Sequence, residues 1–260
     1  MEKVRPKKHL GQHFLTDLRI AEDIANAVTG HEGVRKVLEI GPGMGVLTDF
    51  LLAGQWDLYL MELDPRSVSY LHQKYPGLGQ KIIEGDYLKQ DIARIMKGKY
   101  IIAGNFPYNI SSQIFFKIIP ERDEVVEVVC MLQKEVAQRI ASPKGSREYG
   151  ILSVLLQAYY DIEYLFTVPP EVFDPPPKVQ SGVIRLRRNQ VKSLACDEKL
   201  FFRVVKQAFS TRRKTLRNAL KSMGLTEEMK KEALLDKRAE QLGVPEFEFL
   251  TNKLQRSWKQ

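Results

Sequence analysis

The fold of this chain is decided by the stretch Val37-Leu38-Glu39-Ile40-Gly41-Pro42-Gly43-Met44-Gly45-Val46-Leu47-Thr48. An apolar run, closely spaced glycines and a second apolar segment predict a strand, a tight turn and a helix. Glycine lets the backbone approach a ligand closely, and the helix start offers free N–H groups. The glycine spacing is too short for a dinucleotide-binding turn, and no P-loop lysine follows. We therefore expect a turn that binds another kind of ligand.

Strand-like runs alternate with helix-forming stretches over the first two-thirds of the chain. The runs lie at 36–40, 57–61, 81–84, 100–103, 125–131, 160–166 and 182–186. This alternation predicts an α/β fold with a mainly parallel, doubly wound sheet of seven strands. In such a sheet ligands bind beyond the carboxyl ends of the strands.

The character of the sequence changes after a proline-rich segment, Val168 to Pro177. Beyond about residue 189 β-branched runs disappear and helical patterns dominate. We therefore expect two domains, with residues 1–189 forming the α/β domain and residues 190–260 forming a small all-helical domain.

Two acids follow successive predicted strands. Glu62 stands 21 residues after Gly41, where a carboxylate can accept hydrogen bonds from both ribose hydroxyls. Asp86 follows the run 81–84. At that place its carboxylate, or the neighbouring amide, can form a hydrogen bond with the amino edge of an adenine ring. A lone acid at such a place more often caps the next helix. Ligand-type residues at three successive strand ends favour binding instead.

The fourth strand end carries Asn105-Phe106-Pro107-Tyr108. The Asn oxygen can accept a hydrogen bond from an exocyclic amine, proline leaves the nearby carbonyls free, and tyrosine offers a stacking face. By itself the motif is equally compatible with a turn. Beside the glycine turn and the two acids, it resembles the site of Rossmann-like S-adenosylmethionine-dependent methyltransferases that modify an exocyclic or amide nitrogen.

Three further segments narrow the resemblance. They are Gly11-Gln12-His13-Phe14-Leu15, the proline segment Val172–Ser181, and the stretch Phe201–Leu220. Together with the motifs above they resemble the rRNA adenine dimethyltransferase family, in its small-subunit branch, over roughly residues 3–222. The resemblance implies transfer of methyl groups from S-adenosylmethionine to N6 of two adjacent adenosines near the 3′ end of small-subunit (16S) rRNA.

The resemblance also implies the site residues. The expected catalytic residues are Asn105, Pro107, Tyr108 and Phe173, of which Phe173 would flank the target base. The expected cofactor-binding residues are Gln12, His13, Leu15, Gly41, Gly43, Gly45, Glu62, Leu63, Asp86, Tyr87 and Asn105.

The charge distribution points to a polyanionic partner. The net charge is +8, and the segment from Arg203 to Lys221 contains no acid. Basic side chains neutralise phosphates and release counterions, so this segment is typical of nucleic-acid binding. The expected RNA-binding residues are Arg203, Lys206, Arg212, Arg213, Lys214 and Arg217.

Composition excludes several other classes. The two cysteines, Cys130 and Cys196, have no metal-type spacing, so we expect no metal site and a reduced, cytoplasmic protein. No apolar run reaches membrane-spanning length. We expect a monomer whose partner is small-subunit rRNA within a 30S-type ribosomal precursor.

Three alternatives are open at this point. A DNA adenine or protein glutamine methyltransferase would use a similar Asn-Pro-Pro-Tyr site, but Phe106 and the basic helical segment disfavour both. The sister branch that methylates large-subunit rRNA is disfavoured by the segment 209–220. A non-enzymatic assembly factor is disfavoured by the intact Gly41, Glu62, Asp86 and Asn105.

Overall fold

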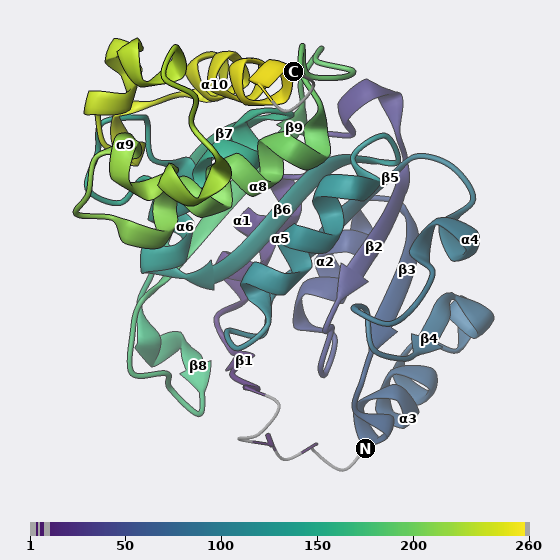
Figure 1. Ribbon diagram of the computed structural model, residues 1–260. Coiled ribbons are helices and arrows are strands. Elements are labelled where there is room, and N and C mark those ends of the chain that lie inside the picture. The colour runs from purple at the N-terminus through teal and green to yellow at the C-terminus, as the bar shows by residue number, and fades with distance from the viewer. Residues whose placement is uncertain (1–3, 5, 8–10, 258–260) are drawn as a thin grey trace. The chain divides into compact units, whose positions relative to one another are not determined.

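The computed structural model describes residues 4, 6–7 and 11–257 (Figure 1). Its strands are β1 Phe14–Leu15, β2 Lys36–Ile40, β3 Asp57–Glu62, β4 Ile82–Glu84, β5 Tyr100–Asn105, β6 Val125–Gln133, β7 Tyr160–Val168, β8 Phe173–Asp174 and β9 Ser181–Arg188. Its α-helices are α1 Leu18–Asn26, α2 Val46–Ala53, α3 Pro65–Lys74, α4 Ile92–Met96, α5 Ser111–Ile118, α6 Lys134–Ala141, α7 Ile151–Gln157, α8 Glu198–Ala208, α9 Leu216–Ala219 and α10 Val244–Ser257.

The chain forms two compact units. The first contains residues 1–138 and 161–188, and the second contains residues 139–160 and 189–260. This division differs from the single cut expected between residues 189 and 190. Residues 139–160 group with the C-terminal part because α7 packs against α8 and α10. Such a contact between distant segments leaves no local signal in the sequence.

The first unit is built on a seven-stranded sheet in the order β4-β3-β2-β5-β6-β9-β7. Strands β2 to β6 pair in parallel, and β9 runs antiparallel to β6. The predicted α/β fold with a mainly parallel sheet is therefore confirmed. Each of the seven predicted runs forms a strand, with ends that differ from the prediction by at most two residues.

The strand register brings the predicted site segments to one edge of the sheet. Ile40 pairs with Met61, and Glu62 pairs with Glu84. The glycine turn, the acid that ends β3 and the segment after β4 consequently leave the sheet at the same level. The carboxyl end of β5 lies on the other side of β2, since Ala103 pairs with Glu39.

The core explains why the central strands read as continuous apolar runs. Alternate strand residues such as Val37 and Ile101 pack with Ile24 of α1, Leu51 of α2 and Leu71 of α3. Their neighbours, which point to the opposite face, are also fully buried, and α5 lies across that side in Figure 1. Burial on both faces is the usual condition of parallel sheets.

Strands β1 and β8 form a second, two-stranded antiparallel sheet, in which Leu15 pairs with Phe173. This pairing places the N-terminal segment beside the proline segment, 158 residues later in the chain. Two-residue strands show no periodicity, so the sequence did not predict them.

The second unit is helical. Three aromatic rings pack together in this unit. The ring centroid of Phe209 lies 6.2 Å from that of Tyr149 and 6.2 Å from that of Phe247. Helix α8 ends at Ala208, and the short 3-10 turn Phe209–Thr211 follows before α9 begins at Leu216. Within the described part of the chain, no helix is long and apolar enough to cross a membrane.

A buried carboxylate stabilises the centre of the first unit. Glu127 of β6 is fully buried. It accepts hydrogen bonds from the Thr29 N–H at 3.0 Å and hydroxyl at 2.8 Å, and from the N–H groups of Gly30 and His31 at 3.1 Å. A side chain of the sheet thereby satisfies the backbone N–H groups of the connection after α1.

We predict that Glu127→Gln destabilises the protein. The new amide keeps one acceptor oxygen, but its NH2 cannot accept, so the N–H groups of the 29–31 connection that face this nitrogen lose their acceptor at a cost of about 1–3 kcal/mol each. Urea unfolding followed by circular dichroism should show a lower midpoint. Glu22→Gln, on the exposed side of α1, is the matched control. Equal midpoints for the two variants would contradict the assignment.

Candidate active site

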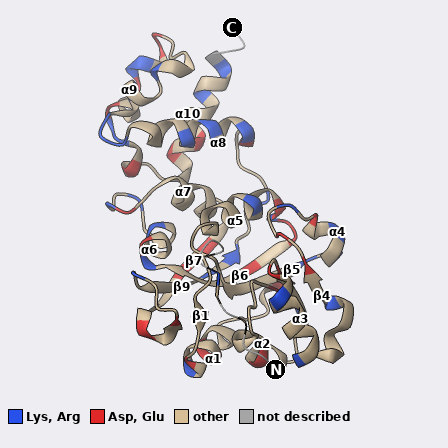
Figure 2. Ribbon diagram, turned by 90° about the horizontal axis from the view of Figure 1, so that it is seen from below, with Lys and Arg blue, Asp and Glu red and all other residues tan. Residues whose placement is uncertain are grey.

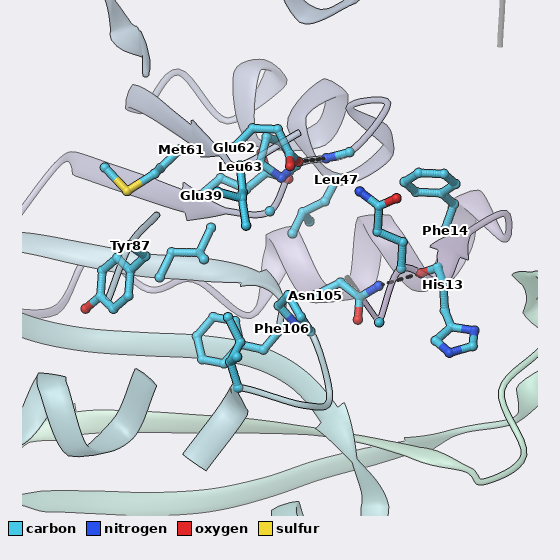
Figure 3. Close-up of a pocket in the computed structure, with 18 of the residues that line it drawn as sticks. His13, Phe14, Glu39, Leu47, Met61, Glu62, Leu63, Tyr87, Asn105 and Phe106 are labelled. Carbon is cyan, nitrogen blue, oxygen red and sulfur yellow. Dashed lines mark hydrogen bonds between the residues drawn. The ribbon is translucent and has the colours of Figure 1, made fainter. Parts of the chain in front are cut away.

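A cavity lies at the carboxyl ends of β2, β3, β4 and β5, within the first unit (Figure 3). The glycine turn, the segments that follow β3, β4 and β5, and the N-terminal residues 11–15 form its wall. Of the predicted cofactor residues it brings together Gln12, His13, Leu15, Gly41, Gly43, Glu62, Leu63, Asp86, Tyr87 and Asn105.

The Glu62 carboxylate fixes the glycine turn. Its Oε2 accepts the Gly43 N–H at 3.0 Å, and its Oε1 accepts the Asp64 N–H at 2.9 Å. Gly41 and Gly43 have φ values of 67° and 57°, a region that favours glycine. A Cβ on Gly43 would also collide with the ring of Phe14. The turn is therefore held by one acid and covered by the N-terminal segment.

Glu62 keeps acceptor capacity for a ligand. Its side chain lines the cavity although the residue is only 5% exposed. Burial raises the pKa of Glu62, while the N–H groups of Asp64 and Gly43 act in the opposite direction. An ionised carboxylate can accept about four hydrogen bonds, and the N–H groups of Gly43 and Asp64 use two of them, while the Leu63 N–H also acts on the carboxylate. The remaining capacity is available to a ligand hydroxyl group.

The apolar side chain of Leu63 and the polar side chain of Asp86 line the same cavity as Glu62. Leu63 is 48% exposed and lines the cavity, so it offers an apolar surface there. Asp86 lines the cavity while its Oδ1 accepts the Leu88 N–H at 2.9 Å. Asp86 therefore caps the turn after β4 and still presents a carboxylate oxygen to the cavity. Tyr87 is buried beside it.

The amide of Asn105 has a defined orientation. Its Nδ2 donates to the backbone oxygen of His13 at 3.0 Å, drawn as a dashed line in Figure 3. A carbonyl oxygen can only accept, so the amide nitrogen must face His13. Among the described residues no group donates to Asn105 Oδ1. This oxygen is therefore available as an acceptor for a ligand in the cavity.

The residues after Asn105 form a rigid wall. Phe106 is buried against Phe115, with ring centroids 5.9 Å apart. The Pro107 carbonyl accepts the Ile110 N–H at 3.2 Å, which closes a turn. The Tyr108 hydroxyl lies 2.5 Å from Ser181 Oγ, and burial raises the pKa of Tyr108. Phe106, Pro107 and Tyr108 all line the cavity.

Two predicted residues are not on the cavity wall. Gly45 begins α2 in the left-handed region, with φ 78°, and a Cβ there would collide with Tyr75. Packing against Tyr75 therefore requires a glycine at position 45. Phe173 is 3% exposed and belongs to the hydrophobic core beside Leu15. The expected contact of Phe173 with the target base stays a prediction, and in the structure its side chain packs in the core.

Glu39 is a cavity residue that the sequence reasoning missed. It is buried, accepts the Thr48 hydroxyl at 2.7 Å and lines the cavity. Burial raises the pKa of Glu39 to about 8. The available signal was an acid inside an otherwise apolar strand, two residues before the glycine turn.

The predicted RNA-binding residues lie in the second unit. Figure 2 shows Lys and Arg on α8 and in the loop beside α9. Arg203, Lys206 and the loop residues 212–214 are exposed. Arg217 differs from them, because its Nε and Nη2 donate to Asp236 Oδ1 at 3.0 and 2.5 Å. An acid from outside the basic segment thus balances Arg217.

The described residues contain no group of three or more His, Cys, Asp or Glu side chains that could hold a metal ion. The polar groups of the cavity include three acids, Glu39, Glu62 and Asp86, together with the oriented amide of Asn105 and the backbone. This donor set suits a polar organic ligand.

Comparison with known proteins agrees with this geometry. Residues 3–252 match the family model described as "Ribosomal RNA adenine dimethylase". A relative in Cytophaga hutchinsonii, named "Ribosomal RNA small subunit methyltransferase A", is 56% identical over 98% of this chain and 99% of its own length. A relative of the same name in Flavobacterium johnsoniae is 55% identical over 98% of each chain.

A solved structure shares the fold. The dimethyladenosine transferase from Plasmodium falciparum superposes with a TM-score of 0.76 at 25% sequence identity, covering 95% of this chain and 98% of that one. The family model and both relatives span nearly the whole sequence. This chain belongs to the ribosomal RNA adenine dimethylase family.

Proposed function

We propose that this chain transfers methyl groups from S-adenosylmethionine to N6 of two adjacent adenosines in the 3′-terminal hairpin loop of small-subunit (16S) rRNA, giving dimethyladenosines during ribosome biogenesis. The observation that carries the proposal is the oriented amide of Asn105, whose oxygen is left for a ligand. The names of the relatives support the small-subunit target. The substrate is a 30S-type precursor, and the enzyme acts as a cytoplasmic monomer.

The cavity fits S-adenosylmethionine. Glu62 keeps acceptor capacity for the ribose hydroxyls, and the exposed Leu63 offers an apolar surface for the adenine ring. Oδ2 of Asp86, which lies 3.8 Å from Lys89 Nζ, can accept from the adenine amino group. The glycine turn leaves room for the methionine part. The cofactor, when bound, supplies a methyl group on a good leaving group, so no strong base is required.

Asn105 orients the target amine. Its Oδ1 and the Phe106 carbonyl, which accepts no hydrogen bond from the described residues, can accept the two N–H bonds of an adenine amino group. Two acceptors localise the nitrogen lone pair toward the methyl donor. Asn105 takes up no proton, and the proton leaves to water after transfer. The adenosine must be unstacked to enter, and Tyr108 stacks on one face of it.

We predict that Asn105→Ala lowers the rate of methyl transfer to small-subunit particles by about 100-fold or more, as loss of one polar stabilising group does elsewhere. Calorimetry should show cofactor affinity within about threefold of the wild type, since Glu62 and Asp86 remain. Asn26→Ala, an exposed amide on α1, is the control.

The same variant tests the reaction in cells. Methylated adenosines are mapped on rRNA from cells that lack this protein and then regain either the wild type or the Asn105→Ala variant. Only the wild type should restore the adjacent dimethyladenosines. Restoration by both proteins would contradict the role of Asn105. Methylation of DNA or large-subunit rRNA instead of small-subunit rRNA would overturn the proposed substrate.

We predict that Glu62→Gln and Asp86→Asn weaken cofactor binding by about 10-fold or more. Each change removes a carboxylate acceptor from a partly desolvated site, where charge-assisted hydrogen bonds contribute about 1.5–3 kcal/mol. Isothermal titration with S-adenosylmethionine measures the effect. Glu84→Gln, at the exposed end of β4 and outside the cavity wall, should bind like the wild type. Unchanged affinity in both cavity variants would exclude the assignment.

The exposed loop residues 212–214 are the best candidates for phosphate contacts. They carry three cations, and none has an ion pair with a described residue. Arg217 is held by Asp236, so we infer that it shapes the loop and contacts phosphate less than its neighbours do.

We predict that Arg212→Gln/Arg213→Gln weakens RNA binding and flattens its salt dependence. Loss of two phosphate contacts should reduce the slope of log K against log salt by about 1.4–1.8. The affinity is measured by filter binding at several salt concentrations. The control Lys192→Gln/Lys199→Gln removes the same charge from exposed sites of the second unit. Equal slopes in both variants would refute a local phosphate role.

A further inference from the structure

The side chain of His13 is directed toward the proline segment. Its backbone oxygen accepts from Asn105, but Figure 3 shows the imidazole directed away from Asn105 and Glu62. The ring Nδ1 lies 2.7 Å from the carbonyl oxygen of Pro175. Because that oxygen can only accept, Nδ1 carries the hydrogen. The imidazole therefore ties the N-terminal segment to the proline segment.

The same ring packs against the tyrosine of the active site. His13 and Tyr108 are stacked, with centroids 5.5 Å apart and an interplanar angle of 28°. Stacked rings at this separation attract each other beyond the effect of the area that they bury. One side of the Tyr108 ring is thus supported by a residue that is itself bonded to Pro175.

Ser181 holds the other end of the tyrosine. Its Oγ lies 2.5 Å from the Tyr108 hydroxyl, and the residue is fully buried at the start of β9. The preceding Gln180 is fixed as well, since its backbone and side-chain oxygens accept from Lys134 at 2.9 and 2.8 Å. Ser181 is therefore a rigid anchor, where a surface hydroxyl would be free to rotate.

We propose that His13 and Ser181 are positioning residues, which fix the Tyr108 ring from its face and from its hydroxyl and couple it to the two ends of the segment 175–180. The proposal rests on the proposed function, in which Tyr108 stacks on the target adenine. A ring held at two points can neither slide along the base nor rotate away from it. Misplacement of a reacting group by about 1 Å can cost about 100-fold in rate.

This role differs from binding the cofactor and from maintaining the fold. A positioning residue should change kcat for methyl transfer while cofactor affinity and unfolding midpoint stay near the wild type. A residue that only stabilises the fold would affect all three. Ser181 acts through one hydroxyl, so its effect should also depend on the presence of the Tyr108 hydroxyl.

The first test is a double-mutant cycle of Ser181→Ala and Tyr108→Phe. Methyl transfer is measured on small-subunit particles from cells that lack this protein. We expect Ser181→Ala to lower kcat about 10-fold in the wild-type background and less than about twofold in the Tyr108→Phe background. Cofactor affinity from calorimetry should be unchanged. Equal losses in both backgrounds, or no loss in either, would overturn the role of Ser181.

The second test separates the two contacts of His13 and is independent of Ser181. His13→Phe keeps a ring against Tyr108, His13→Gln keeps a donor toward Pro175, and His13→Ala keeps neither. We expect both conservative variants to retain more kcat than His13→Ala, with equal cofactor affinity in all three. A His13→Ala variant with wild-type kcat, or with weakened cofactor binding alone, would overturn the role of His13. Inactive wild-type protein on these particles would instead overturn the proposed function and, with it, this inference.

Discussion

The hydrogen bond from the Asn105 amide nitrogen to the His13 carbonyl is the contact on which the active site depends. An unrestrained amide could present either its nitrogen or its oxygen to a ligand. Bonding to a carbonyl removes that ambiguity, because only the nitrogen can donate. The cavity therefore presents an acceptor, and an acceptor selects a ligand with N–H or O–H groups. The same bond fixes the N-terminal segment, which in turn covers Gly43 through Phe14.

The order of the strands explains why the residues proposed to bind the cofactor lie close to the residue proposed to bind the target amine. Strands β4, β3 and β2 follow one another to one side, while β5 and β6 continue on the other side of β2. Connections from β2 and β5 consequently leave in opposite directions and open a crevice between them. The glycine turn after β2 and Asn105 after β5 flank that crevice. Glu62 at the end of β3 and Asp86 after β4 extend the crevice on one side only, which separates the proposed cofactor-binding residues from the proposed amine-binding residue Asn105.

Sequence patterns predicted the parts of this arrangement that are local. Apolar runs gave the seven strands, and spacing after Gly41 pointed to Glu62. Features that depend on distant pairs were missed or misplaced. The pairing of Leu15 with Phe173, and the packing of Phe173 in the core, had no local signal. Asp236 forms an ion pair with Arg217 of the basic segment, which contains no acid of its own. Helix α7 groups with the second unit through packing alone.

Two buried acids, Glu62 and Glu127, differ in a way that residue type and strand pattern do not predict. Glu62 and Glu127 both stand in apolar strands, and both accept backbone N–H groups. Four donors from residues 29–31 approach Glu127 and leave little acceptor capacity. Fewer donors hold Glu62, with the N–H groups of Gly43 and Asp64 at 3.0 and 2.9 Å, and Glu62 faces the cavity with its remaining acceptor capacity. Residue type and burial are alike in the two cases. The number of donors already supplied by the fold distinguishes an acid that maintains structure from one that can bind a ligand.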